Sequence, residues 1–152
     1  MIFVFILFGF LTHTISTLKS DTFPPMNKVR KHYDIDRIAK VCYEKSGVDK
    51  SELHKFEVTE DLQHIPNSHA IKVYLRCFAE LSEAVAPDSN KVLLPKFMKY
   101  FDDLTPAEQL IYLNMGKGCL GRVSKITDLL EYSYKIAVCG KRNDNEHFHI
   151  FY

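Results

Sequence analysis

The segment SHAIKVYLRCFAELSEAV, residues 68–85, decides the fold class of this chain of 152 residues. Its apolar side chains recur at intervals of three and four residues, the period of a helix with one buried face: Ile71, Tyr74, Leu75, Phe78, Leu81 and Val85. The residues that follow, Pro-Asp-Ser-Asn at 87–90, favour a turn. We therefore expect a long helix over residues 68–85.

Helical periodicity also marks the segments before this helix. A first helix begins near Asp34 or Asp36 and ends at the Ser-Gly pair at 46–47. Residues 59–61 can cap a short helix that ends before Pro66, because a residue that precedes proline is biased away from helical geometry.

Three further helices are expected in the C-terminal half of the chain. Pro95 suits the first turn of a helix within residues 91–103. Residues 105–108, Thr-Pro-Ala-Glu, form a capping box at the start of the next helix. Ser124 can cap a last long helix, which Gly140 ends. The sequence thus predicts an all-α fold, a compact bundle of about six short helices.

The N-terminal residues 1–16 are apolar and carry no Lys, Arg, Asp or Glu. Their apolar run is about half as long as the roughly 20 residues of a membrane-spanning helix. Thr14 and Ser16 place small residues where a signal peptidase needs them. We predict a signal peptide over residues 1–16, with cleavage after Ser20 and a buried N-terminal core segment as the alternatives.

The composition fits one small folded domain, residues 17–152, with a C-terminal tail at 141–152. Lys and Arg number 20 against 19 Asp and Glu, and this balance gives no electrostatic drive toward nucleic acid. The hydrophobic content of 46% is too high for an intrinsically disordered chain. We therefore expect a soluble, secreted protein that does not bind nucleic acid.

Four cysteines are spread along the chain, with no Cys-x-x-Cys pair among them: Cys42, Cys77, Cys119 and Cys139. This spacing fits neither a zinc knuckle nor a thioredoxin-type site. In a secreted protein the four are expected to form two disulfides, and the count alone allows three pairings.

Motifs for catalysis and metal binding are lacking. The chain has no Gly-x-Ser-x-Gly elbow, no His-Glu-x-x-His pair and no glycine-rich phosphate loop. The histidine pairs His64 with His69 and His147 with His149 have no third ligand at a recognisable spacing. We expect no enzyme, no metal site and no cofactor.

Three features together resemble a known family. They are the segment KVYLRC at 72–77, the separation of Cys77 from Cys119, and the segment DLLEYSY at 128–134 followed by Cys139. This combination resembles the insect odorant-binding proteins, the pheromone and general odorant-binding family.

Members of that family carry six cysteines, and this chain lacks the second and the fifth. Val73 and Leu130 stand at those two positions, and in the family the two cysteines bond to each other. The chain therefore looks like the minus-C subgroup, which has lost this one bridge. The resemblance implies the pairing Cys42–Cys77 and Cys119–Cys139.

The resemblance also implies a carrier that holds a small hydrophobic molecule, such as an odorant or a pheromone, in an internal cavity. Candidate wall residues are Tyr74, Phe78, Leu81, Phe97, Met98, Phe101, Ile111, Met115, Leu129, Tyr132, Ile136, Phe148 and Ile150. For each of them an ordinary core position is the alternative. As partners, the resemblance implies a small hydrophobic ligand, allows a membrane odorant receptor, and favours a monomer or a weak homodimer.

The last residues, 146–152, are unusually apolar for a chain end. In the family such a tail can fold over or into the cavity, whereas docking elsewhere and disorder are the alternatives. The candidate lid residues are Phe148, Ile150 and Tyr152. His147 and His149 suggest acid-sensitive release as a hypothesis, because an imidazole with an ordinary pKa near 6.5 gains charge as the pH falls.

Two other functions share the secreted helical character. A cytokine-like signalling protein would bind a receptor through an exposed face and keep a dry core. A member of the same family could also carry or sequester hydrophobic molecules outside olfaction, in saliva, reproductive fluid or haemolymph.

Overall fold

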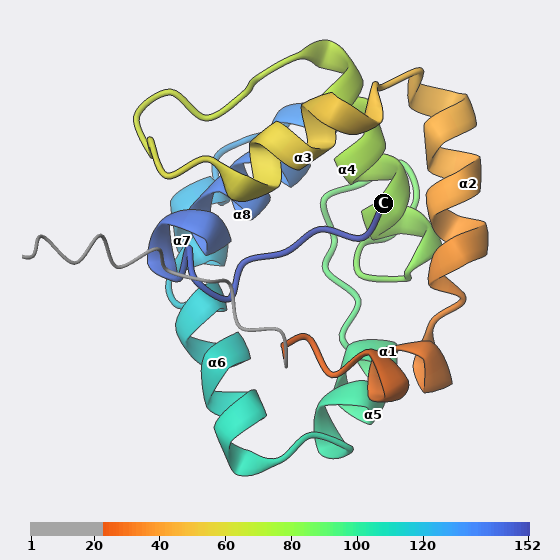
Figure 1. The fold of residues 1–152 in the computed structure, drawn as a ribbon, viewed down its shortest axis with the longest axis vertical. Helices are drawn as coiled ribbons and strands as arrows, with labels where there is room; N and C mark the ends of the chain where they lie inside the picture. Colours follow the sequence, from red (N-terminus) through yellow and green to blue (C-terminus); the bar gives the residue numbers. More distant parts are fainter. Residues whose placement is uncertain (1–22) are drawn as a thin grey trace, which may run out of the picture.

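Eight α-helices make up the part of the chain that the computed structural model describes, residues 23–152 (Figure 1). They are α1 Met26–His32, α2 Ile35–Ser46, α3 Lys50–Val58, α4 His69–Leu81, α5 Pro95–Asp102, α6 Pro106–Gly116, α7 Cys119–Val123 and α8 Leu129–Asn143. None of these helices is long and apolar enough to cross a membrane. The signal peptide that we predict at 1–16 lies outside the described residues.

The helix α2 agrees closely with its sequence pattern. The side chain of Asp34 accepts a hydrogen bond from the backbone N–H of Arg37, and the helix ends at Gly47, whose φ of 64° is left-handed. Its buried residues recur at the helical intervals of three and four, on one face: Ile35, Ile38, Ala39 and Cys42.

The short helix α3 lies earlier in the chain than expected. Asp49 caps it, and Leu53 and Phe56 are completely buried. The prediction of a helix capped by residues 59–61 is wrong, because the Asp61 carboxylate accepts hydrogen bonds from the backbone of the next residues and holds them in a turn.

The helix α4 begins as predicted and ends sooner. Ser68 caps its N-terminus, but the helix ends at Leu81 and does not reach residue 85. Glu83 adopts a left-handed φ of 60°, which helical residues do not tolerate. Val85 then pairs with Val92 in an isolated antiparallel bridge, so residues 84–93 form a loop that folds back beside α4.

The start and the end of α8 also differ from the sequence prediction. Asp128 caps this helix in place of Ser124, which follows α7. Gly140 lies inside the helix and does not end it. A Cβ at this position would lie 3.3 Å from Cγ of Met115, so glycine allows α8 to pass close to α6.

The other helix starts follow the expected signals. Pro95 occupies the first turn of α5, and Thr105 with Glu108 forms the capping box of α6. The short helices α1 and α7 have no counterpart among the predicted helices. In α1 the single buried residue is Val29, so this helix leaves no periodic pattern for the sequence to reveal.

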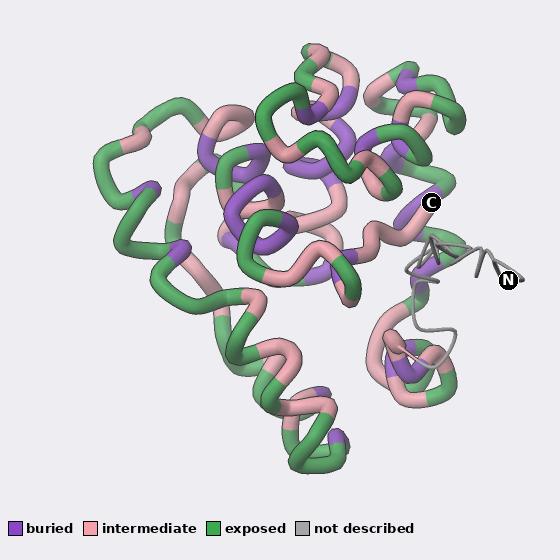
Figure 2. Tube along the Cα trace, turned by 60° about the vertical axis from the view of Figure 1, so that its left-hand side comes forward, coloured by how far each residue is buried: buried purple, intermediate pink, exposed green. Residues whose placement is uncertain are grey.

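The helix α4 is central to the packing, since it lies against both α2 and α8. The helix α8 also contacts α6 and α7, and α1 contacts α5. The disulfide Cys42–Cys77 joins α2 to α4, and Cys119–Cys139 joins α7 to α8. Buried residues gather toward the centre of the molecule, as Figure 2 shows. The prediction of an all-α bundle with two disulfides is confirmed.

Candidate functional site

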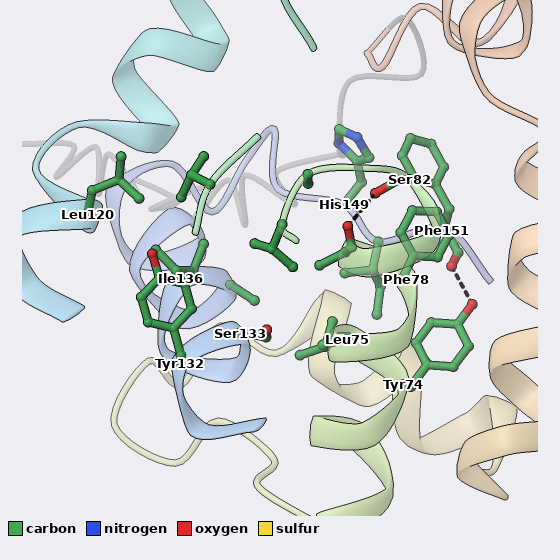
Figure 3. A pocket seen from close by; sticks show the side chains of 16 residues that line it. Tyr74, Leu75, Phe78, Ser82, Leu120, Tyr132, Ser133, Ile136, His149 and Phe151 are labelled. Carbon is green, nitrogen blue, oxygen red and sulfur yellow. Dashed lines mark hydrogen bonds between the residues drawn. The ribbon is translucent and has the colours of Figure 1, made fainter. Parts of the chain in front are cut away.

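A pocket of about 360 Å³, here called the main pocket, lies between α4, α8, the loop at 84–92 and the C-terminal segment (Figure 3). Its wall consists of Tyr74, Leu75, Phe78, Ala79, Ser82, Ala84, Val85, Val92, Leu120, Tyr132, Ser133, Ile136, Ala137, His149, Ile150 and Phe151. Most of these side chains are apolar. The volume falls near the lower end of the range of about 300 to 1,000 Å³ that is usual for small-molecule sites.

Two helices supply opposite sides of the main pocket. The positions 74, 75, 78 and 79 of α4 share one helical face, which Ser82 at the end of the helix extends, and the positions 132, 133, 136 and 137 of α8 share another. Figure 3 shows Tyr132 and Ile136 on one side of the pocket and Phe78 on the other, with Ser133 between them. Helical periodicity thus determines which side chains of α4 and α8 face the pocket once the two helices pack against each other.

The loop at 84–92 closes one side of the pocket because a buried arginine holds it. Arg76 is only 3% exposed, and its guanidinium donates hydrogen bonds to the backbone oxygens of Ala86 (3.0 Å) and Ser89 (2.7 Å). The same group also donates to the side-chain oxygens of Glu80 and Asn90. These bonds satisfy the buried charge and fix the loop against α4.

The C-terminal segment supplies another part of the wall. The hydroxyl of Tyr74 donates a hydrogen bond to the backbone oxygen of Phe151 over 2.6 Å, and burial raises the pKa of this tyrosine. The rings of Phe78 and Phe151 stack with their centroids 5.8 Å apart. Phe148 is buried in the core against Phe56, with ring centroids 5.9 Å apart.

The end of the chain is fastened to α3. Glu57 accepts hydrogen bonds from the backbone N–H of Ile150 (3.2 Å) and from the hydroxyl of Tyr152 (2.7 Å). His147 lies within 2.9 Å of the Asp144 carboxylate, and the ring of His149 lies 2.9 Å from the backbone oxygen of His147. The tail is thus part of the folded structure.

A second pocket, of about 230 Å³, adjoins the main pocket. The two share Phe78, Ser82, Ala84, Val92, His149 and Phe151. The residues of the second pocket alone are Val29, Tyr33, Ile35, Leu93, Leu94, Phe97, Tyr100 and Tyr112. The stacked pair of Phe78 and Phe151 therefore lies in the wall between two adjacent apolar spaces.

The walls of both pockets are nearly free of charge. Among the described residues that line them there is no Lys, Arg, Asp or Glu. Burial raises the pKa of Tyr33 to about 12 and raises that of Tyr112 further, and the hydroxyls of Tyr100 and Tyr112 lie 2.9 Å apart. These tyrosines stay neutral at physiological pH, so both pockets favour an uncharged, apolar molecule.

The predicted wall residues divide between the pockets and the core. The main pocket brings together Tyr74, Phe78, Tyr132, Ile136 and Ile150, and the second pocket contains Phe78 and Phe97. The remaining candidates lie outside both walls: Leu81, Met98, Phe101, Ile111, Met115, Leu129 and Phe148. Phe148 is buried in the central core, and Leu81 and Met115 are partly buried against that core. Phe101, on α5, packs against the cluster that contains Val29 of α1, and Met98 is 43% exposed.

Sequence reasoning missed the smaller members of the walls. Ala79, Ser82, Ser133 and Ala137 lie on the same helical faces as the predicted residues, so periodicity could have found them. Of the loop residues 84–93, only Val85 belongs to the expected helical stripe, and the tertiary structure alone places the loop at the pockets.

No group of three His, Cys, Asp or Glu residues within 23–152 is arranged to hold a metal ion. All four cysteines are in disulfides. The described site therefore consists of apolar walls with a few hydroxyl groups and one imidazole.

Comparisons with known proteins agree with this architecture. The PBP/GOBP family model matches residues 25–143, which is most of the chain. No curated protein matches the sequence with significance. The matched residues contain both disulfides and the helices α4 and α8 that form the main pocket. The chain therefore belongs to the PBP/GOBP family, and its four cysteines in two disulfides fit the minus-C subgroup.

Proposed function

We propose that the protein is a secreted carrier that binds a small hydrophobic molecule in the main pocket and transports it through aqueous fluid. The observation that carries this proposal is the pocket of about 360 Å³ with apolar, uncharged walls in a member of the PBP/GOBP family, an odorant- and pheromone-binding family. Odorants and pheromones are the ligand class that the family suggests.

The proposed contacts to the ligand come from the main pocket. They are made by Tyr74, Phe78, Tyr132, Ile136 and Ile150, with smaller side chains between them. Burying an apolar ligand against these side chains removes apolar surface from water, at about 25 cal/mol for each Å². The affinity should therefore rise with ligand size until the pocket is filled.

The C-terminal tail is proposed to act as a lid. Ile150 and Phe151 belong to the pocket wall, and Glu57 holds Ile150 and Tyr152 against α3. Within the tail, His147 and His149 remain candidates for acid-sensitive release. His149 lines both pockets, where a gain of charge beside an apolar wall would oppose closure, whereas His147 lies outside both walls, against the Asp144 carboxylate.

Secretion is supported by the two disulfides, which persist in oxidising compartments. Members of the family are secreted, and the sequence predicts a signal peptide ahead of the described residues. A membrane odorant receptor as a partner and a monomer or weak homodimer remain predictions from the family resemblance.

The pocket favours a carrier over a helical signalling protein, which has no need for an apolar space beside its core. A carrier that acts outside olfaction would use the same pocket. The tissue in which the protein is expressed distinguishes this variant of the function from odorant transport.

A fluorescent apolar probe, N-phenylnaphthylamine, tests the carrier proposal. We expect saturable binding to the protein and displacement by volatile hydrophobic molecules. Ala79→Phe fills the main pocket from α4 and should weaken probe binding by about tenfold or more, through steric exclusion from the pocket.

Ala107→Phe is the matched control, because Ala107 is exposed on α6, away from both pockets. Circular dichroism and thermal unfolding show whether each variant is folded. Probe binding that is absent from the protein, or that is equal in the two folded variants, would contradict the proposal.

A further inference from the structure

The main pocket contains five side chains with hydrogen-bonding groups: Tyr74, Ser82, Tyr132, Ser133 and His149. Three of them have partners within the protein. Tyr74 donates to the backbone oxygen of Phe151, and Ser82 donates to the backbone oxygen of Ala79 over 3.3 Å. The ring of His149 lies 2.9 Å from the backbone oxygen of His147.

Ser133 differs from these three, because its Oγ is buried and has no hydrogen-bond partner. The residue is 7% exposed and lies on α8 within the pocket wall. Figure 3 shows it between Tyr132 and Leu75. Among the described residues, the other buried side-chain oxygen without a partner belongs to Tyr43, which is not in the pocket wall.

A serine at this position is unfavourable for the protein alone. A buried hydroxyl that has lost water and gained no partner destabilises the fold, and alanine is the better helix former. Neighbouring positions of the same face, such as Ala137, carry the apolar residues that a simple core would use. A ligand that supplies the missing partner would recover the lost hydrogen bond.

We propose that Ser133 determines specificity in the main pocket by donating a hydrogen bond to an oxygen of the bound molecule. This inference rests on the proposed carrier function. It narrows the ligand class to neutral molecules with an oxygen-bearing group, such as a ketone, aldehyde, ester or alcohol, on an apolar body.

The lack of Lys and Arg in the pocket wall disfavours ionised ligands such as carboxylates. A carboxylate in the main pocket would be buried with no Lys or Arg of the wall beside it. The uncompensated charge would oppose binding. A fatty acid at neutral pH is therefore a poorer ligand than the ketone of the same shape.

A matched pair of ligands separates the hydrogen bond from apolar contact. The first is a medium-chain methyl ketone, and the second is the hydrocarbon in which a methylidene group replaces the carbonyl oxygen. Their affinities are measured by displacement of N-phenylnaphthylamine from the protein and from Ser133→Ala. We expect Ser133→Ala to weaken ketone binding by about 2- to 10-fold, and to leave hydrocarbon binding unchanged.

Ser82→Ala is the control variant, since Ser82 lines the same pocket but already has a partner. It should change the affinities for both ligands by the same factor. The melting temperature of Ser133→Ala should equal or exceed that of the unchanged protein, whereas a hydroxyl with a structural role would lower it.

The outcomes separate this inference from the carrier proposal. Equal changes in ketone and hydrocarbon affinity in Ser133→Ala overturn the role of Ser133 while the carrier function stands. A carboxylate that binds as tightly as the ketone at neutral pH overturns the restriction to neutral ligands. If the unchanged protein binds neither member of the pair saturably, both proposals fail.

Discussion

The buried side chain of Arg76 holds the loop at 84–92 against α4. Its guanidinium donates to backbone oxygens of the loop, and that loop contributes Ala84, Val85 and Val92 to the pocket wall. The same side chain forms an ion pair with Glu80 one turn along α4. A buried charge with this many partners stabilises a geometry that apolar contacts alone would leave loose.

At this scale we predict that Arg76→Met lowers the free energy of unfolding by about 2 to 4 kcal/mol, because it leaves buried carbonyl groups without a donor. Urea denaturation measures the change. The control is Arg37→Met, since Arg37 forms an exposed ion pair with Asp34 and should contribute less than about 1 kcal/mol. Similar losses in the two variants would contradict the role of Arg76.

The helices α4 and α8 hold the main pocket between them without a covalent link. Lys72 on α4 and Glu131 on α8 form an ion pair of 2.6 Å, and the hydrogen bond from Lys72 keeps the pKa of Glu131 below its ordinary value. The ammonium of Lys72 also lies 5.3 Å from the centroid of the Tyr134 ring. Val73 and Leu130 are each next to a member of the ion pair, and the family resemblance implies that they stand at the positions of the two missing cysteines.

The double variant Val73→Cys/Leu130→Cys is expected to form a third disulfide, since the adjacent ion pair shows that the two helices approach each other here. The new bridge should stabilise the protein by about 2 to 4 kcal/mol, because it restricts the unfolded chain. A free-thiol assay and urea denaturation test this, and each single variant serves as a control. Two reactive thiols in the oxidised double variant would show that the two positions are not aligned.

In the whole molecule, the C-terminal segment lies at the main pocket, which α4 and α8 form. The tail crosses toward α4 (Figure 1), and residues 149–151 become part of the wall of the main pocket. Phe148 anchors the tail in the core, and Tyr152 fastens its end to Glu57. Closure of the pocket therefore depends on contacts between parts of the chain that are distant in sequence.

Removal of residues 149–152 is expected to reduce probe affinity about tenfold or more, because the pocket loses three wall residues while Phe148 remains. If His149 controls release, the affinity of the full chain falls at acidic pH and that of the truncated chain, which keeps His147 but lacks His149, falls less. Tyr152→Phe controls for loss of the single hydrogen bond to Glu57. An identical pH dependence in the two chains would rule out His149 as the acid-sensitive group.

The sequence by itself determined the fold class, the family and most of the helical faces. Local signals were sufficient where a cap or a period acts within a few residues, as at Ser68 and Thr105. The sequence prediction was wrong about the two ends of α8, which it placed at Ser124 and Gly140. Where this helix begins and ends depends on how α8 packs against α6 and α7. A side chain that can cap a helix does so only if the tertiary fold starts the helix at that residue.

The tertiary structure alone decided which apolar residues face the pocket. Phe148 has the same apolar character as Phe78 and Ile136, yet Phe148 is buried in the core, whereas Phe78 and Ile136 line the main pocket. Hydrophobicity determines that such residues avoid water, and it does not determine whether protein or ligand covers them. That choice depends on the angle between α4 and α8, on the loop held by Arg76 and on the path of the tail, which contacts between distant residues fix.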